Sequence, residues 1–409
     1  MKLRTCRFCG TSLQLTFCDL GMSPLSNTFV KPSLAHCSET FYPLHAFVCE
    51  RCFLVQLEQF ESPENIFGEY VYFSSYSDSW LTQCENYAQV MCSTLGLGRH
   101  SLVIEVASND GYLLQYFKRV NIPVLGIEPA RNVAAIAEQK GIPTLNAFFG
   151  ERVAMELAQE GRSADLVVAN NVMAHVPDLN DFVAGLRRIL KPSGLLTIEF
   201  PHLLKLIGEH QFDTIYHEHF SYFSFTTANR VLAHHGLAVH DVEYLPTHGG
   251  SLRLHACPIE AGRTANPRVA ALLAEESRAG LQQMAIYTSF SEKAKKAKRD
   301  LLRFLIEAKN AGKHVVGYGA PAKGNTLLNY CGIRTDLLDY TVDRSPHKQG
   351  LLLPGTRIPV FEPKKIMETR PEYVLILPWN LKDEILEQMA GIRDWGGKFV
   401  VPSPDITIL

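Results

Sequence analysis

Runs of apolar residues alternate with amphipathic stretches through the middle of the chain. "LVIEV" at 102–106 and "LVVA" at 166–169 are almost wholly apolar, which is typical of strands buried on both faces of a parallel sheet. Residues 132–141 place apolar side chains at helical spacing and end at a glycine, as helices often do. Strands that alternate with helices at this pitch predict a parallel sheet with helices on both faces.

Two α/β units joined by a helical connection follow from this pattern. For the first unit the pattern predicts a helix at 81–97, three strand–turn–helix segments at 101–117, 123–141 and 164–194, and a strand at 194–200. For the second, smaller unit it predicts a strand–turn–helix segment at 314–330 and strands at 337–346 and 371–379. The helical stretch between them contains "EKAKKAKRD", which we interpret as a solvated helix face. We therefore divide the chain into an N-terminal module (1–75), a core domain (76–262), a helical connector (263–311) and a C-terminal α/β domain (312–409).

Composition narrows the class of protein. The chain has 409 residues, of which 46% are hydrophobic and 20% charged, as in an ordinary globular protein of two or three domains. A formal net charge of −2 gives no reason to expect binding to nucleic acid or to an anionic membrane. No apolar run reaches the roughly 18 residues of a membrane span, and "MKLRTCRFCG" is not followed by the apolar core of a signal peptide. We therefore expect a cytoplasmic protein. The sequence does not determine its oligomeric state and is compatible with a monomer.

Two cysteine pairs predict a metal site in the N-terminal module. Cys6 and Cys9 form one C-x-x-C motif, and Cys49 and Cys52 form another. Four residues between the pairs are alternative ligands: Cys18, His36, Cys37 and His45. Four thiolates in paired motifs are the ligand set that structural zinc prefers, and the long loop between the pairs costs little extra to close. Since four protein ligands leave no open position, this zinc would stabilise the module and take no part in chemistry.

Acidic residues stand at the ends of the first two predicted core strands. Ligands of open parallel sheets bind at this edge. "EVASNDG" retains only Gly111 of the G-x-G-x-x-G pattern that a pyrophosphate requires, whereas Glu105, Asp110 and Glu128 are acidic. Each of these carboxylates alone could cap a helix or face solvent. Together they favour S-adenosylmethionine, which carries a sulfonium, an α-amino group and ribose hydroxyls, with Glu128 placed for the ribose.

The order of motifs resembles a known family. The segments "IEVASNDGYLL", "GIEPA", "VVANNVMAHVPDL", "FDTIYHEHFSYFS", "LPTHGGSLR" and "VVGYGAPAKG" are similar to those of the sugar C-methyltransferases of deoxysugar biosynthesis, among them C-3′-methyltransferases of nucleotide-linked 3-amino-4-keto sugars. The resemblance covers essentially the whole chain. It implies a class I methyltransferase (Rossmann-like) core with an N-terminal zinc-binding module and a C-terminal Rossmann-like α/β domain.

The resemblance also implies a cofactor site. Against the wider class I pattern E-x-G-x-G-x-G, the chain has Ala107 and Asn109 in place of two glycines, a loop familiar in the sugar-methylating subgroup. The expected contacts with S-adenosylmethionine are Glu105, Ala107, Asn109, Asp110, Gly111, Glu128, Asn170 and Asn171.

The segment "IYHEHFSYFSF" at 215–225 carries the candidate acid–base chemistry. Methylating a carbon next to a ketone needs a base to remove the α-proton and a donor for the developing oxyanion. The resemblance implies His219 as the base, with Tyr216 and Glu218 around the sugar. It also implies His175 of "MAHVPD" and Tyr72 of "YVYFSS", for which Tyr70 or Tyr76 is an alternative.

Other interpretations of this segment stay open. His217 and His219 alternate along the chain and could face one metal ion, but the H-E-x-x-H spacing and a third ligand are missing. The four aromatic residues at 220–225 are expected to pack, and we interpret His217 as a structural residue.

The C-terminal domain opens with the glycine-rich turn "GYGAPAKG" before a helix. Helix N-termini attract anions, and the spacing is not that of a Walker loop. The resemblance implies that this domain helps to hold a nucleotide-linked sugar, with His248 and Gly249 at the domain junction. The expected substrate contacts are His248, Gly249, Gly317, Tyr318, Gly319 and Lys323.

The sequence therefore predicts an S-adenosylmethionine-dependent C-methyltransferase that acts on a nucleotide-linked keto-deoxysugar. The alternatives are an NAD-dependent nucleotide-sugar dehydrogenase or epimerase, a non-catalytic nucleotide-sugar-binding protein, and an O- or N-methyltransferase acting on a related small molecule.

Overall fold

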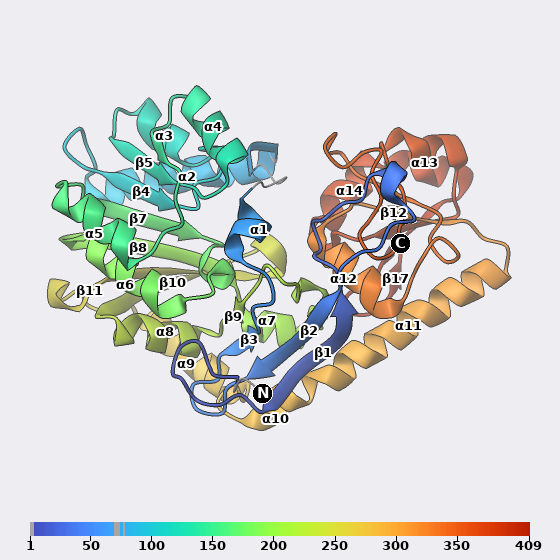
Figure 1. Ribbon diagram of the computed structural model, residues 1–409, viewed down its shortest axis with the longest axis horizontal. Coiled ribbons are helices and arrows are strands. Elements are labelled where there is room, and N and C mark those ends of the chain that lie inside the picture. Colours follow the sequence, from blue (N-terminus) through green and yellow to red (C-terminus); the bar gives the residue numbers. More distant parts are fainter. Residues whose placement is uncertain (1–3, 69–73, 77) are drawn as a thin grey trace.

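The computed structural model describes residues 4–68, 74–76 and 78–409. Figure 1 shows two α/β lobes that stand side by side above a shared base. We call them the core lobe, built on the seven-stranded sheet, and the C-terminal lobe, built on a six-stranded sheet. The base is formed by the blue N-terminal strands and by the long helix α11 (Phe290–Asn310), which runs from beneath the core lobe to the C-terminal lobe.

The core lobe is a mostly parallel sheet of strand order β10-β11-β8-β7-β4-β5-β6. Its strands are β4 (Val103–Val106), β5 (Val124–Ile127), β6 (Thr144–Leu145), β7 (Ala164–Asn170), β8 (Leu190–Pro201), β10 (Leu237–Leu245) and β11 (Ser251–Pro258). Its helices are α2 (Asp78–Leu95), α3 (Leu114–Arg119), α4 (Arg131–Gln139), α5 (Glu151–Gln159), α6 (Leu179–Ile189), α7 (Leu203–Gly208) and α8 (Phe225–His234). All residues of β4 and β5 are buried, as the apolar runs predicted, and β11 is antiparallel to both its neighbours.

The N-terminal module builds a separate sheet of order β1-β2-β3-β9. Its elements are β1 (Leu15–Ser23), η1 (Pro32–Leu34), β2 (Tyr42–Val48), β3 (Val55–Leu57), α1 (Pro63–Phe67) and η2 (Ser74–Tyr76). The last strand, β9 (Ser221–Tyr222), comes from the histidine-rich segment and pairs with β3. The module is therefore joined through its sheet to the segment that carries the candidate chemistry.

The C-terminal lobe has strand order β14-β13-β12-β15-β16-β17, with only β17 antiparallel. Its strands are β12 (Val315–Tyr318), β13 (Thr341–Val342), β14 (Val360–Phe361), β15 (Tyr373–Ile376), β16 (Lys398–Val401) and β17 (Thr407–Ile408). Its helices are α12 (Ala322–Cys331), α13 (Lys364–Thr369), η7 (Trp379–Leu381), α14 (Lys382–Gln388) and η8 (Ala390–Trp395). One apolar core includes residues of β1, β2, α11, α12 and β15, so the base and this lobe are packed as one body.

Two predicted helices differ from the observed ones. The helix predicted to reach 194 ends at Ile189, because Pro192 disfavours helical backbone at the residue before it, and β8 begins at Leu190. The single helical stretch predicted at 267–311 consists of α9 (Pro267–Arg278), α10 (Met284–Thr288) and α11. Helix α9 ends just before Gly280, whose φ of +86° cannot continue a helix. Among the residues described, no helix combines the length and apolarity that a membrane span requires.

Candidate active site

The four predicted zinc ligands converge in the N-terminal module. The Sγ atoms of Cys6 and Cys52, and those of Cys9 and Cys49, lie 3.5 Å apart, and all four lie within 4.8 Å of one another. A tetrahedral zinc with bonds of about 2.3 Å requires sulfur atoms about 3.8 Å apart, so the cluster fits the ion. Within the described residues this is the only cluster of metal-ligand side chains, and His217 and His219 form no second one.

The loop after β4 lies at the edge of the sheet where the cofactor is expected, and it has an unusual backbone. Ala107, Asn109 and Gly111 have φ values of +57°, +48° and +78°, at the three positions where the wider pattern has glycine. A left-handed alanine costs about 1–3 kcal/mol and persists where the surroundings fix it. Glu128 helps to hold the loop in this conformation. Its two carboxylate oxygens accept hydrogen bonds from the backbone N–H groups of Asn109 and Ala130, both at 2.9 Å.

Buried polar atoms without protein partners gather at this edge. Among the described residues, hydrogen-bond partners are missing for buried oxygen atoms of Glu105, Ser108, Asp110, Asn170, Asn171 and Glu199. Burial raises the pKa of Glu105 well above its usual range, although the nearby Tyr112 hydroxyl favours the charged form. Each unpartnered buried polar group costs about 1–3 kcal/mol, so a cluster of them indicates a polar ligand. The set suits the sulfonium, amino and hydroxyl groups of S-adenosylmethionine.

Sequence reasoning missed several residues of this edge. A small, narrow pocket lies beside Asn170. It is lined by Trp80, Gln83, Cys84, Tyr87, Leu113, Asn170, Glu199 and Arg253. Arg253 donates two hydrogen bonds to Glu199 and leaves the other oxygen of that carboxylate unpartnered. Glu199 stands near the end of its strand, so the strand-end rule that selected Glu105 could have found it.

The structure brings His219, His175 and Tyr216 together. The ring centroid of His219 lies 4.7 Å from that of His175 and 4.0 Å from that of Tyr216. The Nδ1 of His219 is 2.9 Å from the carbonyl oxygen of Thr214. Because a carbonyl only accepts, Nδ1 carries the proton and Nε2 of the neutral ring has a free lone pair. Burial, aided by His175, lowers the pKa of His219 well below its usual value.

His248 approaches this group from the loop between β10 and β11. Its φ of +56° is strained for a residue with a side chain, and Asn171 Nδ2 lies 3.4 Å from its Nε2. His248 is exposed, and the protein atoms packed around its ring, together with the charge of Lys323, lower its pKa below the usual value. Burial also lowers the pKa of His175 to about 4, so both rings are neutral near pH 7.

Lys323, in the first turn of α12, reaches the same region from the C-terminal lobe. Its Nζ donates to Asn380 Oδ1 at 2.8 Å and lies 4.3 Å from the ring centroid of Trp379. The indole N–H of Trp379 donates to Asp213 at 2.7 Å. Burial lowers the pKa of Lys323 to about 8, while the negative charge of Asp213 opposes this shift. Asp213 and Trp379 were not predicted as site residues. Asp213 lies in the segment "FDTIYHEHFSYFS", where the histidines and tyrosines were selected instead, and Trp379 lies in none of the motifs.

Other predicted site residues lie in packed surroundings. Glu218 accepts a hydrogen bond from Asn27 of the N-terminal module at 2.6 Å. A Cβ on Gly317 would lie 2.6 Å from Thr341 Oγ1, and one on Gly319 would lie 2.5 Å from Pro378, so protein atoms already fill those spaces. The Tyr318 hydroxyl donates to Gln388 at 3.2 Å. Gly249 lets Trp379 approach, since its Cβ would lie 2.4 Å from that ring.

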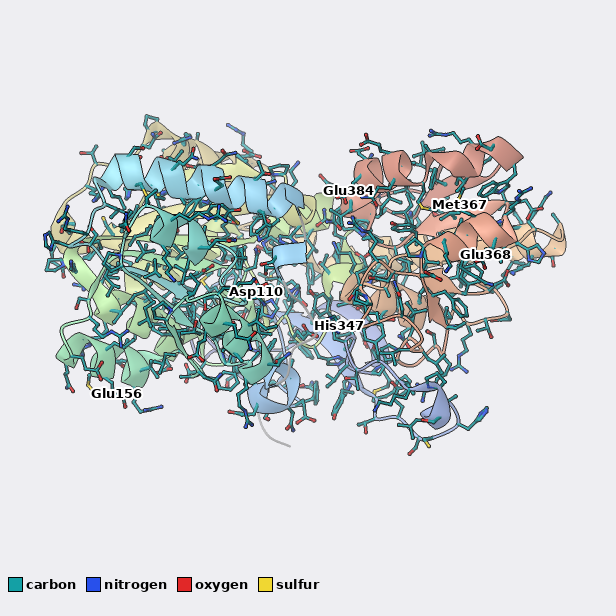
Figure 2. All side chains as sticks on the ribbon, turned by 90° about the horizontal axis from the view of Figure 1, so that it is seen from above. Asp110, Glu156, His347, Met367, Glu368 and Glu384 are labelled. Carbon is teal, nitrogen blue, oxygen red and sulfur yellow. The ribbon has the colours of Figure 1, made fainter. Side chains whose placement is uncertain are left out.

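The site lies where the two lobes face each other. Figure 2 shows Asp110 on the side of the core lobe that faces the C-terminal lobe, and His347 and Glu384 on the facing side of the latter. Tyr72 and its alternative Tyr70 lie outside the described residues, and the side chain of Tyr76 lies outside them as well.

The sheet order, the left-handed backbone at the three glycine positions of the loop after β4, and the polar edge define a class I S-adenosylmethionine-dependent methyltransferase. Three family models match the chain: "Putative zinc binding domain" over 6–67, "Methyltransferase domain" over 88–242 and "C-methyltransferase C-terminal domain" over 246–404. The chain is 36% identical over 407 residues to C-methyltransferase NovU of Streptomyces niveus, covering 99% of this chain and 96% of that protein. The chain therefore belongs to the C-methyltransferase family, and its zinc-binding module and S-adenosylmethionine cofactor are those predicted from the sequence.

More distant likenesses are confined to part of the chain. A ubiquinone biosynthesis O-methyltransferase of Bartonella tribocorum is 26% identical over 97 residues, which are 24% of this chain and 39% of that protein. The crystal structure of a magnesium protoporphyrin IX methyltransferase from Synechocystis PCC 6803 is 16% identical with a TM-score of 0.33, covering 43% of this chain and 78% of that one.

Replacing Glu128 with glutamine is expected to weaken S-adenosylmethionine binding about tenfold. The change removes a charge that holds two backbone N–H groups, and hydrogen bonds to charged groups contribute about 1.5–3 kcal/mol. Isothermal titration calorimetry would measure the dissociation constant. Glu138→Gln, at an exposed position of α4, is the matched control and should bind as wild type does. Unchanged affinity in Glu128→Gln would rule out a role of this carboxylate.

Proposed function

We propose that this C-methyltransferase acts on a nucleotide-linked keto-deoxysugar, at a carbon next to the ketone. The sequence resemblance to sugar C-methyltransferases supports the substrate class. The arrangement of neutral histidines at the edge where the lobes meet supports the chemistry, because carbon methylation requires removal of an α-proton before transfer. S-adenosylmethionine, when bound, supplies an electrophilic methyl group on a sulfonium.

The hydrogen bond from His219 Nδ1 to the Thr214 carbonyl carries the proposal. It orients the ring and leaves Nε2 as the basic atom. In the proposed reaction the α-proton of the sugar passes to Nε2, and the electron pair of the broken C–H bond moves toward the ketone oxygen. The enolate carbon would then be the nucleophile toward the methyl group, and the electron pair of the broken C–S bond would remain on the cofactor sulfur. The lowered pKa of His219 keeps the ring in its basic form at neutral pH.

Neighbouring groups can stabilise the developing enolate oxygen. The ring of Tyr216 lies tilted against that of His219, and a phenolic O–H is a suitable donor. His175 stands edge-on to His219 and is neutral, so one of its ring nitrogens carries a donor N–H. We assign Tyr216 and His175 to the reacting end of the sugar, and Lys323 with the start of α12 to its anionic nucleotide diphosphate.

The assignment of Lys323 predicts a dependence of substrate affinity on pH. With a pKa of about 8, Lys323 is charged at pH 7 and largely neutral at pH 9. Since the ammonium attracts the diphosphate, KM for the nucleotide-sugar should rise several-fold as pH rises through 8, and kcat/KM should fall. Initial rates from pH 6.5 to 9.5 would measure this. Lys323→Arg should abolish the rise because arginine stays charged. Lys323→Met should show a high KM at every pH, and a wild-type-like profile in Lys323→Met would contradict the assignment.

Mass spectrometry in heavy water tests the proposed function. The protein is incubated with a panel of nucleotide-linked 4-keto-6-deoxysugars, either with S-adenosylmethionine or with S-adenosylhomocysteine in its place. We expect a methyl gain in the first case and deuterium uptake by recovered substrate in the second, because proton removal needs no methyl donor. Neither change on any sugar of the panel would refute the substrate class.

A further inference from the structure

We propose that Arg7, which lies between two zinc ligands, positions the segments that carry His175 and His219. The roles of these histidines rest on the proposed function, whereas the contacts of Arg7 do not. Arg7 occupies the middle of the Cys6–Cys9 motif, so its backbone follows the geometry of the zinc-binding turn. Its guanidinium bonds the chain after His175 and lies against the Phe220 ring next to His219, while its other hydrogen bond goes to Leu57 of the module.

The first contact of Arg7 reaches the segment of His175. One terminal nitrogen of its guanidinium donates to the carbonyl oxygen of Pro177 at 2.7 Å, two residues beyond His175. In return, Asn180 Nδ2 donates to the backbone carbonyls of Arg7 and Phe8, at 3.2 and 3.0 Å. The zinc-binding turn and the chain after His175 are thus held to each other from both sides.

The second contact of Arg7 reaches the segment of His219. The other terminal nitrogen donates to the carbonyl oxygen of Leu57, whose own N–H donates to the carbonyl of Phe220 at 3.0 Å. The guanidinium carbon also lies 5.5 Å from the ring centroid of Phe220. Phe220 N–H in turn donates to the carbonyl of Ala174 at 2.7 Å. The two residues bonded here, Ala174 and Phe220, are the immediate neighbours of His175 and His219.

Gln56 forms a second connection between the zinc-binding turn and the histidine-rich segment. Its side-chain oxygen accepts from the backbone N–H of Arg7 at 2.9 Å, and its amide nitrogen lies 3.2 Å from Cys6 Sγ. Gln56 pairs with Ser221 in the β3–β9 ladder. The zinc-binding turn is therefore connected to the histidine-rich segment through a strand as well as through the arginine.

The chemistry of arginine fits a positioning role. Among the described residues Arg7 forms no ion pair, and its two terminal nitrogens donate to main-chain carbonyls in different segments. A planar guanidinium fixes two such directions at once, whereas a lysine ammonium on a flexible stem does not. Burial lowers the pKa of Arg7 to about 10, so it stays charged throughout the physiological range.

The test compares Arg7→Met, Arg7→Lys and the matched control Arg4→Met in the full-length, zinc-loaded protein. Arg4 lies in the same module but is bonded to Glu58 near the surface. We expect all three variants to retain one zinc per chain by elemental analysis and to bind S-adenosylmethionine within about twofold of wild type. Arg7→Met should lower kcat about 30-fold or more with KM changed less than threefold, Arg7→Lys should lie between it and wild type, and Arg4→Met should match wild type.

A second readout does not depend on turnover. NMR titration of protein labelled at histidine, with His219 assigned from its asparagine variant, would follow the pKa of His219. That pKa is depressed by tight burial against His175. It should move toward 6.5 in Arg7→Met and stay at its wild-type value in Arg4→Met.

Three outcomes would overturn the inference. These are wild-type turnover in Arg7→Met with zinc retained, an unchanged titration of His219, and loss of zinc from both Arg7 variants, which would make Arg7 part of the metal site alone. If wild-type protein methylates no keto sugar, the proposed function fails, but the titration still decides whether Arg7 positions His219.

Discussion

Replacing His219 with asparagine is expected to lower turnover by about 10²–10⁴-fold, the usual contribution of a positioned general base. Asparagine can still donate a hydrogen bond toward the Thr214 carbonyl, which His219 Nδ1 contacts at 2.9 Å, but it offers no basic nitrogen. Affinity for S-adenosylmethionine should stay within about twofold, because the residues predicted to contact the cofactor lie at the ends of β4, β5 and β7. Deuterium uptake by the sugar in heavy water should disappear together with methyl transfer.

His217→Asn is the matched control for this experiment. His217 lies two residues away, but its Nε2 is 3.2 Å from the Pro43 carbonyl in β2, which places it on the side of the N-terminal module. This variant should retain most turnover and the deuterium exchange. If His219→Asn still exchanged deuterium at the wild-type rate, another group would be the base, and His175 would be the next residue to replace.

With His219 as the proposed base, its lowered pKa is expected to determine the acid side of the pH profile. Protonation removes the basic lone pair, so activity falls only as pH drops through the pKa of the folded protein. Because that pKa lies well below 6.5, kcat/KM should stay constant from pH 7.5 down to about 6.5. An unperturbed histidine would already have lost half its activity at pH 6.5.

Local patterns in the sequence were sufficient for features that depend on neighbouring residues. The paired C-x-x-C motifs predicted four sulfur atoms that the structure places within 4.8 Å. The strand-end rule found Glu105 and Asp110, each of which has a buried oxygen without a partner among the described residues. Both predictions depend on residues that are close in the sequence. The first uses the turn within each C-x-x-C motif, and the second uses the carboxyl end of a strand in a parallel sheet.

Contacts between distant segments could not be predicted in this way. Pairing of β9 with β3 leaves no periodic signature, because each strand is only two or three residues long. The hydrogen bond from Trp379 to Asp213 joins the two lobes through residues that look like ordinary core and loop. The glycine-rich turn of the C-terminal lobe suggested close approach of a ligand, whereas Gly317 and Gly319 lie against Thr341 and Pro378. A missing Cβ can admit either a ligand or a neighbouring strand, and the sequence does not distinguish them.

Replacing Cys49 with serine is expected to remove zinc and destabilise the whole N-terminal module. Structural zinc contributes about 10–16 kcal/mol to small zinc-dependent domains, and a serine hydroxyl is a poor substitute for a thiolate ligand. A loss of only about 3 kcal/mol would lower Tm by about 12–24 °C for a domain of 60–100 residues. Turnover should be lost as well, because β3, which follows the second motif, pairs with β9 beside His219.

Elemental analysis, thermal unfolding and turnover measured on one preparation would separate these effects. Cys37→Ser is the matched control, since Cys37 belongs to the same module but is exposed and lies outside the cluster. It should retain zinc, Tm and turnover. Retention of zinc and Tm in Cys49→Ser would show that the fourth thiolate is dispensable. Loss of zinc with turnover intact would show that the catalytic segments hold their geometry without the module, which would also contradict the role inferred for Arg7.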